Sequence, residues 1–410
     1  MKVEIEVNNS TDPKAQFVTW TPCPCRIRVT DPTGVTASTV NLRIAATAAA
    51  AGGEVVFRAG TSGAFSATLT VQVPTSGSTV PFFAAGRFGR ASTRSGDATI
   101  QARMGTTSVG TADVMVRIRK NANALTSDER DRFVAAFAQL NNQGAGRFSD
   151  FRLMHTDESS PQAHFAAGFL PWHRAYLLDL ERELQAIDPS VALPYWRFDQ
   201  PAPKLFNRDF FGVSDSLGAV QFSAGNPLRF WTTDGVQGIN RRPFFNTSTG
   251  RPGVRTEAQT LALGGGGNLY RLFRNLEGNP HGTAHTSFGG SISSIGTAAR
   301  DPLFFLLHCN VDRLWAKWQR QFGRANPAQA SAYDSNPDNP VGHNLADSMW
   351  PWNGIVGGDR PSTAPGGALA ASSAVSAPGP QPRVQDCVDY QGSVSAAARL
   401  GFDYDDVPSA

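Results

Sequence analysis

The 410-residue sequence has few cysteines, few charged side chains and no long hydrophobic run. Its four cysteines, at 23, 25, 309 and 387, do not make a disulfide framework. No apolar run approaches the length of a membrane span, and the N-terminus has no signal-peptide core. A cytoplasmic protein, a mature secreted form and export by another route all stay open. Without a Lys/Arg-rich run, the net charge of +3 gives no indication of nucleic-acid binding.

Composition divides the chain into three parts. Residues 1–115 contain nine short segments rich in Val, Ile, Thr and Phe, separated by Gly, Ser, Thr and Pro, which predicts an all-β sandwich of immunoglobulin-like type. Residues 116–355 form a mainly α part. Residues 356–410 begin as a low-complexity stretch, expected to be a flexible linker or surface loop, and end in ordered-looking sequence.

The N-terminal part carries no catalytic cluster. It is either a binding or docking module of unknown partner or a stabilising appendage, and the sequence leaves both open. Cys23 and Cys25, in "CPC", are expected to be a strand-edge feature and not metal ligands.

Four segments of the middle part have helical patterns. The first begins after a cap at Thr126 or Ser127 and ends near Gly144, and the others cover about 170–187, 256–276 and 302–322. In the second, Leu177, Leu180 and Leu184 share one face. The charged residues of that helix are expected mostly on its wetter sides: Asp179, Glu181, Arg182 and Glu183.

Histidine is scarce and unevenly distributed. The chain has seven histidines, and none lies in the first 154 residues. Six fall in two groups of three: His155, His164 and His173, then His281, His285 and His308. His173 lies on the leucine stripe of its helix, and His281 and His285 are four residues apart, so a helix would place both on one face. The seventh, His343, stands apart in a Pro/Asn-rich loop.

Several inward-facing histidines need partners, and a metal accommodates many neutral imidazoles. One zinc takes three or four ligands, so six suit two metals with three nitrogens each. All-imidazole ligation fits zinc, copper, iron or nickel. Three-coordinate sites leave room for an exogenous ligand between the metals, and for copper that ligand is dioxygen.

Two longer motifs carry a family resemblance. The stretches "HFAAGFLPWHRAYLLDLE" and "DPLFFLLHCNVDRLW" resemble the type-3 dicopper proteins, namely tyrosinases, catechol oxidases (polyphenol oxidases) and haemocyanins. The resemblance covers about 117–355, and the late "GFDY" is similar to the mark that closes the catalytic core in plant and fungal members. Gln162 and Ala163 precede His164 with no cysteine nearby, so the thioether of those members is expected to be absent, as in bacterial members.

The resemblance implies a mainly α helical-bundle catalytic domain with two copper ions. The first triad would hold one copper and the second triad the other. Asp312 would accept the free ring N–H of a ligand and fix its tautomer, or else form a salt bridge. Phe304 matches an aromatic residue that packs on the histidines.

Three further residues match positions around the substrate. Glu277 matches the glutamate that orients a water near the second copper and assists phenol deprotonation, although it could instead be an exposed helix-end carboxylate. Ile295 matches the gate position and is too small to close the site. Gly282 stands where active tyrosinases often carry Asn, which argues against strong monophenol hydroxylation.

The implied function is a copper-dependent oxidoreductase. It would use O₂ to oxidise a small o-diphenol to the o-quinone, and would hydroxylate a monophenol that can be deprotonated and placed there. An o-aminophenol oxidase of secondary metabolism, a haemocyanin-like oxygen carrier and a zinc hydrolase are the alternatives. The C-terminal segment is expected to close the core without plugging the site.

Overall fold

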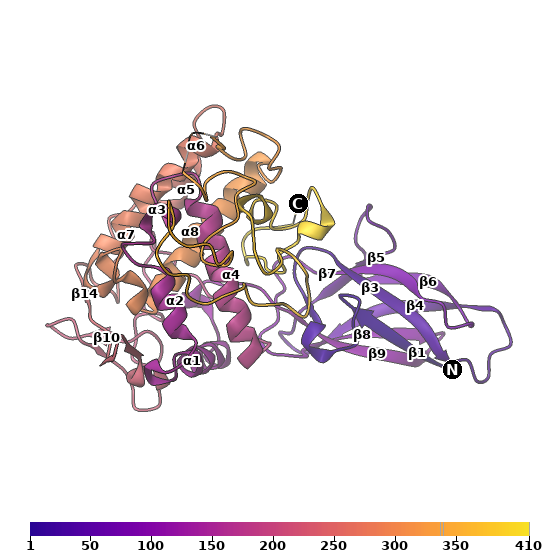
Figure 1. The fold of residues 1–410 in the computed structure, drawn as a ribbon. Coiled ribbons are helices and arrows are strands. Elements are labelled where there is room, and N and C mark those ends of the chain that lie inside the picture. Colours follow the sequence, from indigo (N-terminus) through magenta and orange to yellow (C-terminus); the bar gives the residue numbers. More distant parts are fainter. Residues whose placement is uncertain (337, 339, 410) are drawn as a thin grey trace. The chain divides into compact units, whose positions relative to one another are not determined.

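The structure, a computed structural model, describes residues 1–336, 338 and 340–409 (Figure 1). The chain divides into two compact units. The first comprises Met1–Ile118, Ser372–Ser376 and Gly401–Ala410, and the second comprises Arg119–Ala371 and Ala377–Leu400. None of the described helices combines the length and apolar character that a membrane crossing requires.

The first unit is built from strands. They are β1 (Lys2–Val7), β2 (Phe17–Val18), β3 (Cys23–Asp31), β4 (Thr39–Ala48), β5 (Val55–Arg58), β6 (Thr68–Pro74), β7 (Val80–Gly86), β8 (Ala98–Met104) and β9 (Thr107–Val116). They form a four-stranded sheet of order β1-β3-β7-β5 and a five-stranded sheet of order β2-β9-β8-β4-β6. The expected all-β character is confirmed.

Side-chain alternation explains this unit. In β3, Cys25, Ile27 and Val29 are buried, whereas Arg26 and Arg28 between them are exposed. The buried side chains of both sheets belong to one hydrophobic cluster, so each sheet covers the apolar face of the other. Cys23 and Cys25 belong to this core, and β3 has a neighbour on each side, so they do not mark a sheet edge.

The end of the chain packs within the first unit. The indole Nε1 of Trp20 donates to the carbonyl oxygen of Tyr404 at 2.9 Å, and the amide of Thr21 donates to Asp403 Oδ2 at 2.8 Å. Both donors are buried and need acceptors. The "GFDY" segment, expected to close the catalytic core, therefore supplies hydrogen-bond acceptors to the β unit.

The second unit is mainly helical. Its α-helices are α1 (Ser127–Asn141), α2 (Phe148–Met154), α3 (Ser160–Ala163), α4 (Phe169–Ile187), α5 (Glu257–Leu261), α6 (Tyr270–Phe273), α7 (Thr283–Thr286) and α8 (Leu303–Phe322). Helix α1 begins with a capping box in which Thr126 and Glu129 each bond the other's backbone N–H. Helices α4 and α8 are the longest of the described residues, and they pack against each other.

Short elements complete the second unit. Three two-stranded ribbons pair β10 (Val213–Ser214) with β11 (Val220–Gln221), β12 (Thr232–Thr233) with β13 (Val236–Gln237), and β14 (Arg241–Pro243) with β15 (Phe288–Gly290). Near the site lie the 3₁₀ turns η6 (Arg274–Glu277), η8 (Ser291–Ser293) and η9 (Ala298–Arg300), and the π-helical turn η7 (Gly278–Gly282).

The prediction of a single helix over 256–276 is wrong. The structure has α5, the 3₁₀ turn η5 (Ala262–Gly264), a loop, α6 and η6 instead. The break falls in the run of four glycines at 264–267, where Gly265 has φ +65° and the following Asn268 has φ +46°. Glycine adopts left-handed backbone at no steric cost and weakens a helix, so the run ends α5 despite the flanking apolar pattern.

The expected exposure of the charged residues in α4 is also wrong. Asp179, Glu181 and Arg182 are all buried. A later segment covers this side of the helix: Asp179 accepts from Trp352 Nε1 and from the Ala370 amide, each at 2.8 Å. Helical periodicity cannot show that a distant segment will cover the polar face.

The low-complexity segment has specific partners in the second unit. Gln162 Nε2 donates to the carbonyl oxygen of Asp359 at 2.9 Å. Arg182 Nη1 donates to the carbonyl of Ala370 at 3.0 Å. Buried polar side chains therefore hold much of the stretch for which the composition favours a flexible linker.

Candidate metal centre

The first three histidines come together from three elements. His155 follows α2, His164 follows α3, and His173 lies in the first turns of α4. All three are buried, and one ring nitrogen of each lies within 4.8 Å of those of the other two. Separate helix ends thus bring three imidazoles to one point.

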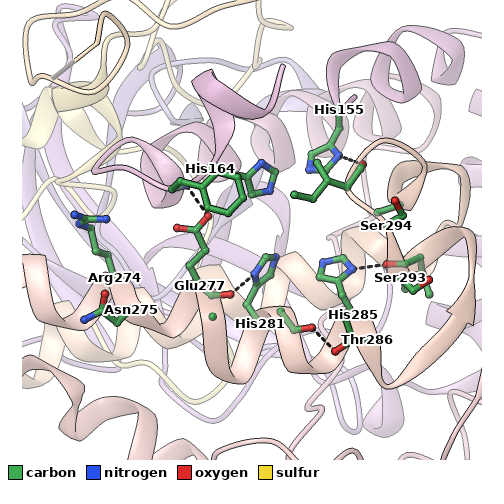
Figure 2. A pocket seen from close by; sticks show the side chains of 16 residues that line it. His155, His164, Arg274, Asn275, Glu277, His281, His285, Thr286, Ser293 and Ser294 are labelled. Atoms are coloured by element: carbon green, nitrogen blue, oxygen red, sulfur yellow. Dashed lines mark hydrogen bonds between the residues drawn. The ribbon is translucent and has the colours of Figure 1, made fainter. Parts of the chain in front are cut away.

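The second three histidines form an equivalent group. His281 lies in the π-helical turn η7, His285 in α7 and His308 in α8, and one ring nitrogen of each lies within 4.8 Å of the others. The groups adjoin, because the rings of His173 and His308 are stacked with centroids 4.2 Å apart. In Figure 2, His155 and His164 face His281 and His285 across the cavity.

Backbone carbonyls fix the tautomers of four of these histidines. Their Nδ1 atoms lie at hydrogen-bond distance from a carbonyl oxygen: His155 from Ile295 (3.1 Å), His173 from Phe169 (2.8 Å), His281 from Glu277 (2.7 Å) and His285 from Ile292 (2.7 Å). A carbonyl oxygen only accepts, so Nδ1 carries the proton and Nε2 presents a lone pair.

These lone pairs lack protein donors. The Nε2 atoms of His155 and His173 are buried without a hydrogen-bond partner among the described residues. His281 Nε2 and His285 Nε2 lie 3.2 and 3.1 Å from the same Nε2 of His308, which can offer at most one proton between them. Two sets of three imidazoles with unsatisfied, converging lone pairs fit two metal ions bound through nitrogen.

Burial keeps the six rings neutral. Desolvation lowers the pKa of each, for His155 to about 3 and for His285 to about 4, and the neighbouring histidines lower several of them further. Neutral imidazole is the form that binds a metal, so the site is ready for metal at neutral pH.

The same pKa shifts predict that the metal-free protein is acid-labile. Below about pH 6.5 the unfolded chain binds more protons than the folded one, so each such histidine removes up to about 1.4 kcal/mol of stability per pH unit as the pH falls. Asp179 and Glu277, whose pKa burial raises to about 6 and about 7, act in the opposite direction but are outnumbered. Urea unfolding of the metal-free chain at about pH 7 and about pH 5 measures the difference in the free energy of unfolding. Equal or greater stability at the lower pH would contradict it.

Comparison with known proteins identifies the family. Residues 145–321 match the model of the common central domain of tyrosinase. The tyrosinase of Streptomyces glaucescens is 36% identical in an alignment of length 268 that covers 58% of this chain and 92% of that protein. Grixazone synthase of Streptomyces griseus is 31% identical in an alignment of length 263 that covers 50% of this chain and 85% of that protein. The structure of deoxygenated haemocyanin from Rapana thomasiana has a TM-score of 0.48 and 23% identity, covering 71% of this chain and 70% of that one.

The chain belongs to the tyrosinase family. Its cofactor is a pair of copper ions, and it is a copper-dependent oxidoreductase of tyrosinase type. The resemblance found in the two histidine motifs is thereby confirmed. The match to the family model, residues 145–321, lies within the second unit and leaves the β unit outside it.

Phe304 packs among the histidines. Its ring centroid is 4.2 Å from that of His308, 4.6 Å from that of His155 and 5.8 Å from that of His285. One phenyl ring thus packs against both triads and restricts how their imidazoles turn.

Asp312 does not have the partner expected of it. Four of the six Nδ1 atoms face backbone carbonyls, and those of His164 and His308 have no partner among the described residues, so none donates to Asp312. Its carboxylate instead accepts from Arg174 Nε at 2.6 Å and Arg119 Nη1 at 3.2 Å. Backbone carbonyls accept from four of the six ligands, and the Asp312 carboxylate provides the counter-charge for two buried guanidiniums.

The remaining candidate residues line a cavity of about 580 Å³ beside the histidines. Glu277, Gly282 and Ile295 all belong to its wall. The Oε1 of Glu277 accepts from the Phe165 amide at 2.8 Å, and burial is the main cause of its raised pKa. Glu277 is therefore not an exposed helix-end carboxylate.

Sequence reasoning missed two parts of the site. The carbonyls of Phe169, Ile292 and Ile295 orient ligands, but any residue supplies a carbonyl, so no side-chain pattern marks them. Arg274 and Phe165 also line the cavity. A usable signal existed for both, because Phe165 directly follows His164 and Arg274 lies three residues before Glu277.

Proposed function

We propose that this tyrosinase-family chain uses O₂ to oxidise o-diphenols to o-quinones, with one copper held by His155, His164 and His173 and the other by His281, His285 and His308. The observation that carries the proposal is the convergence of two buried, neutral imidazole triads beside a cavity large enough for one aromatic ring. Two o-diphenols would lose four electrons and four protons to one O₂, giving two o-quinones and two waters.

When bound, the copper pair supplies the redox chemistry, and the protein supplies position and proton transfer. Glu277 lies on the cavity wall and its pKa is raised to about 7, so its carboxylate can take a proton from a phenol or an intervening water near neutral pH. Ile295 gives the rim an apolar edge without closing it.

Gly282 favours diphenol oxidation over monophenol hydroxylation in this proposal. It lines the cavity directly after His281 and offers no side chain to help deprotonate a monophenol. Apart from the adjoining residues of its own turn, the described part of the chain places one atom within 4 Å of a Cβ built there, the Glu277 carbonyl oxygen at 3.3 Å, so the cavity stays open at this point.

Replacing Glu277 by Gln tests the proton-accepting role. We expect kcat for catechol to fall about 100-fold, since general-base catalysis contributes at least this much. Copper content should stay unchanged, because only the backbone carbonyl of Glu277 holds a ligand. Steady-state kinetics together with metal analysis measure both. An unchanged kcat would remove Glu277 from the mechanism.

An o-aminophenol oxidase is the second candidate. It is favoured by the likeness to grixazone synthase, an aminophenol oxidase. Initial rates with catechol, o-aminophenol and phenol separate the possibilities. Fast catechol turnover supports the first proposal, and turnover of o-aminophenol alone supports the second. Reversible O₂ binding without turnover of any of the three would indicate an oxygen carrier.

For the rest of the chain, we propose that residues 116–355 act as the catalytic domain and that residues 1–115 form an immunoglobulin-like sandwich. The support for the sandwich is the pair of packed sheets with one shared core. Its partner is not assigned.

A further inference from the structure

One wall of the cavity carries an arginine that the family resemblance does not account for. Arg274 begins the turn η6, three residues before Glu277, and both side chains line the cavity. Its side chain is 26% exposed. In Figure 2, Arg274 and Asn275 lie on the side of Glu277, away from Ser293 and Ser294.

The guanidinium of Arg274 has hydrogen-bonding capacity to spare. Among the described residues it forms no hydrogen bond, and its Nε is a buried atom without a partner. Its one ion pair is with Asp334, whose Oδ2 lies 3.8 Å from Nε, too far for a hydrogen bond. By contrast, the buried Arg241 forms two hydrogen bonds with Asp301, at 2.7 and 2.5 Å.

A structural role explains little of this arrangement. A partly exposed ion pair at such a distance contributes little to stability. A guanidinium that faces a substrate cavity with its donors unused is instead suited to a planar anion, which it can bind through two parallel N–H groups.

The rest of the wall makes Arg274 distinctive. Besides the histidines, it consists of neutral polar or apolar residues and one carboxyl group, that of Glu277, which already accepts from the Phe165 amide. Arg274 is therefore the permanent cation of the cavity lining within the described part of the chain.

We propose that Arg274 is a specificity-determining residue that binds a carboxylate on the substrate ring. The substrate class is then an o-diphenol or o-aminophenol that carries an acid group and is a net anion. Its hydroxyl end faces the histidines, and its acid end faces η6. This inference rests on the proposed function, because it concerns the same cavity and the same oxidation.

The test compares 3,4-dihydroxybenzoate with its neutral methyl ester, which has the same ring and hydroxyl groups. For the copper-loaded full chain, Arg274→Gln should lower the ratio of kcat/KM for the acid to that for the ester by roughly 10- to 100-fold, the range for losing a charge-assisted hydrogen bond. The loss should appear in KM for the acid, with the ester unaffected. Arg274→Lys should give an acid-to-ester ratio between those of wild type and Arg274→Gln, because lysine keeps the charge without the planar pair of donors.

Arg271→Gln is the matched control. Arg271 lies one turn earlier, is exposed and does not line the cavity, so the ratio should not change. A readout independent of turnover is the Kd of 4-hydroxybenzoate and 4-hydroxybenzamide with oxygen excluded. Arg274→Gln should raise the Kd of 4-hydroxybenzoate and leave the Kd of 4-hydroxybenzamide unchanged.

The outcomes separate the two proposals. If wild-type chain oxidises catechol and the ester but Arg274→Gln leaves the acid-to-ester ratio and the Kd values unchanged, this inference is wrong and the proposed function stands. If no o-diphenol is oxidised, the proposed function fails. In that case, if Arg274→Gln still selectively weakened the binding of 4-hydroxybenzoate, Arg274 would remain assigned as an anion-binding residue.

Discussion

His308→Gln is expected to abolish catechol oxidation and to empty the second metal position. The Nε2 of His308 lies 3.2 Å from that of His281 and 3.1 Å from that of His285, so it is the point at which this triad converges. Two imidazoles alone do not hold a copper ion firmly. We expect kcat to fall by more than about 100-fold, beyond the cost of losing a residue that only supports a ligand. Metal analysis and initial rates measure the change.

His343→Gln is the matched control for that variant. His343 is also buried, but it lies outside both triads, and its ring bridges the Gly168 amide at 3.1 Å and the Pro161 carbonyl at 2.7 Å. Its loss should cost about 1–3 kcal/mol of stability and leave both copper ions in place. If His308→Gln kept full activity, or if both variants lost copper equally, the ligand assignment would be wrong.

Asp312→Ala is expected to destabilise the fold by about 3–5 kcal/mol, the cost of leaving a buried charge uncompensated. Asp312 accepts from Arg174 and Arg119, whose side chains are both 0% exposed. Glu181 remains beside Arg119, but the acceptors that Arg174 keeps in the described part of the chain are neutral, namely Gln319 and the carbonyl of Cys387.

The network also positions the ligands. Arg174 follows His173 in α4, and Asp312 lies one turn after His308 in α8, so their ion pair ties together the two helices that present the stacked rings. Urea unfolding measures the loss of stability, and Asp131→Ala, which removes an exposed carboxylate paired with Arg130, should change it by no more than about 1 kcal/mol. A similar small effect of both variants would show that the buried network does not stabilise the unit.

Sequence patterns predicted what local rules determine. The cap expected at Thr126 or Ser127 is formed by Thr126, and the strand-rich character of the first unit follows equally from neighbours in sequence. The histidines could be assigned to two metal-binding groups from the sequence alone, because they are scarce and fall in two clusters of three. A helix cap and a strand are encoded within a few residues, so local rules predict them directly.

The features that sequence reasoning missed depend on distant contacts. Asp179 looked like a surface residue until Trp352 and Ala370 supplied its donors. Asp312 looked like a ligand support because its buried partner Arg119 lies far away in sequence. The carbonyl of Ile292 orients His285 only because the chain turns back after α7. Helical periodicity does not contain this information.

Copper analysis of the reconstituted full chain tests the central claim most directly. The two buried triads predict about two copper ions per chain, with catechol oxidation lost on chelation and restored by copper. A single metal ion per chain, or a preference for zinc with no catechol oxidation, would contradict the assignment of one copper to each triad.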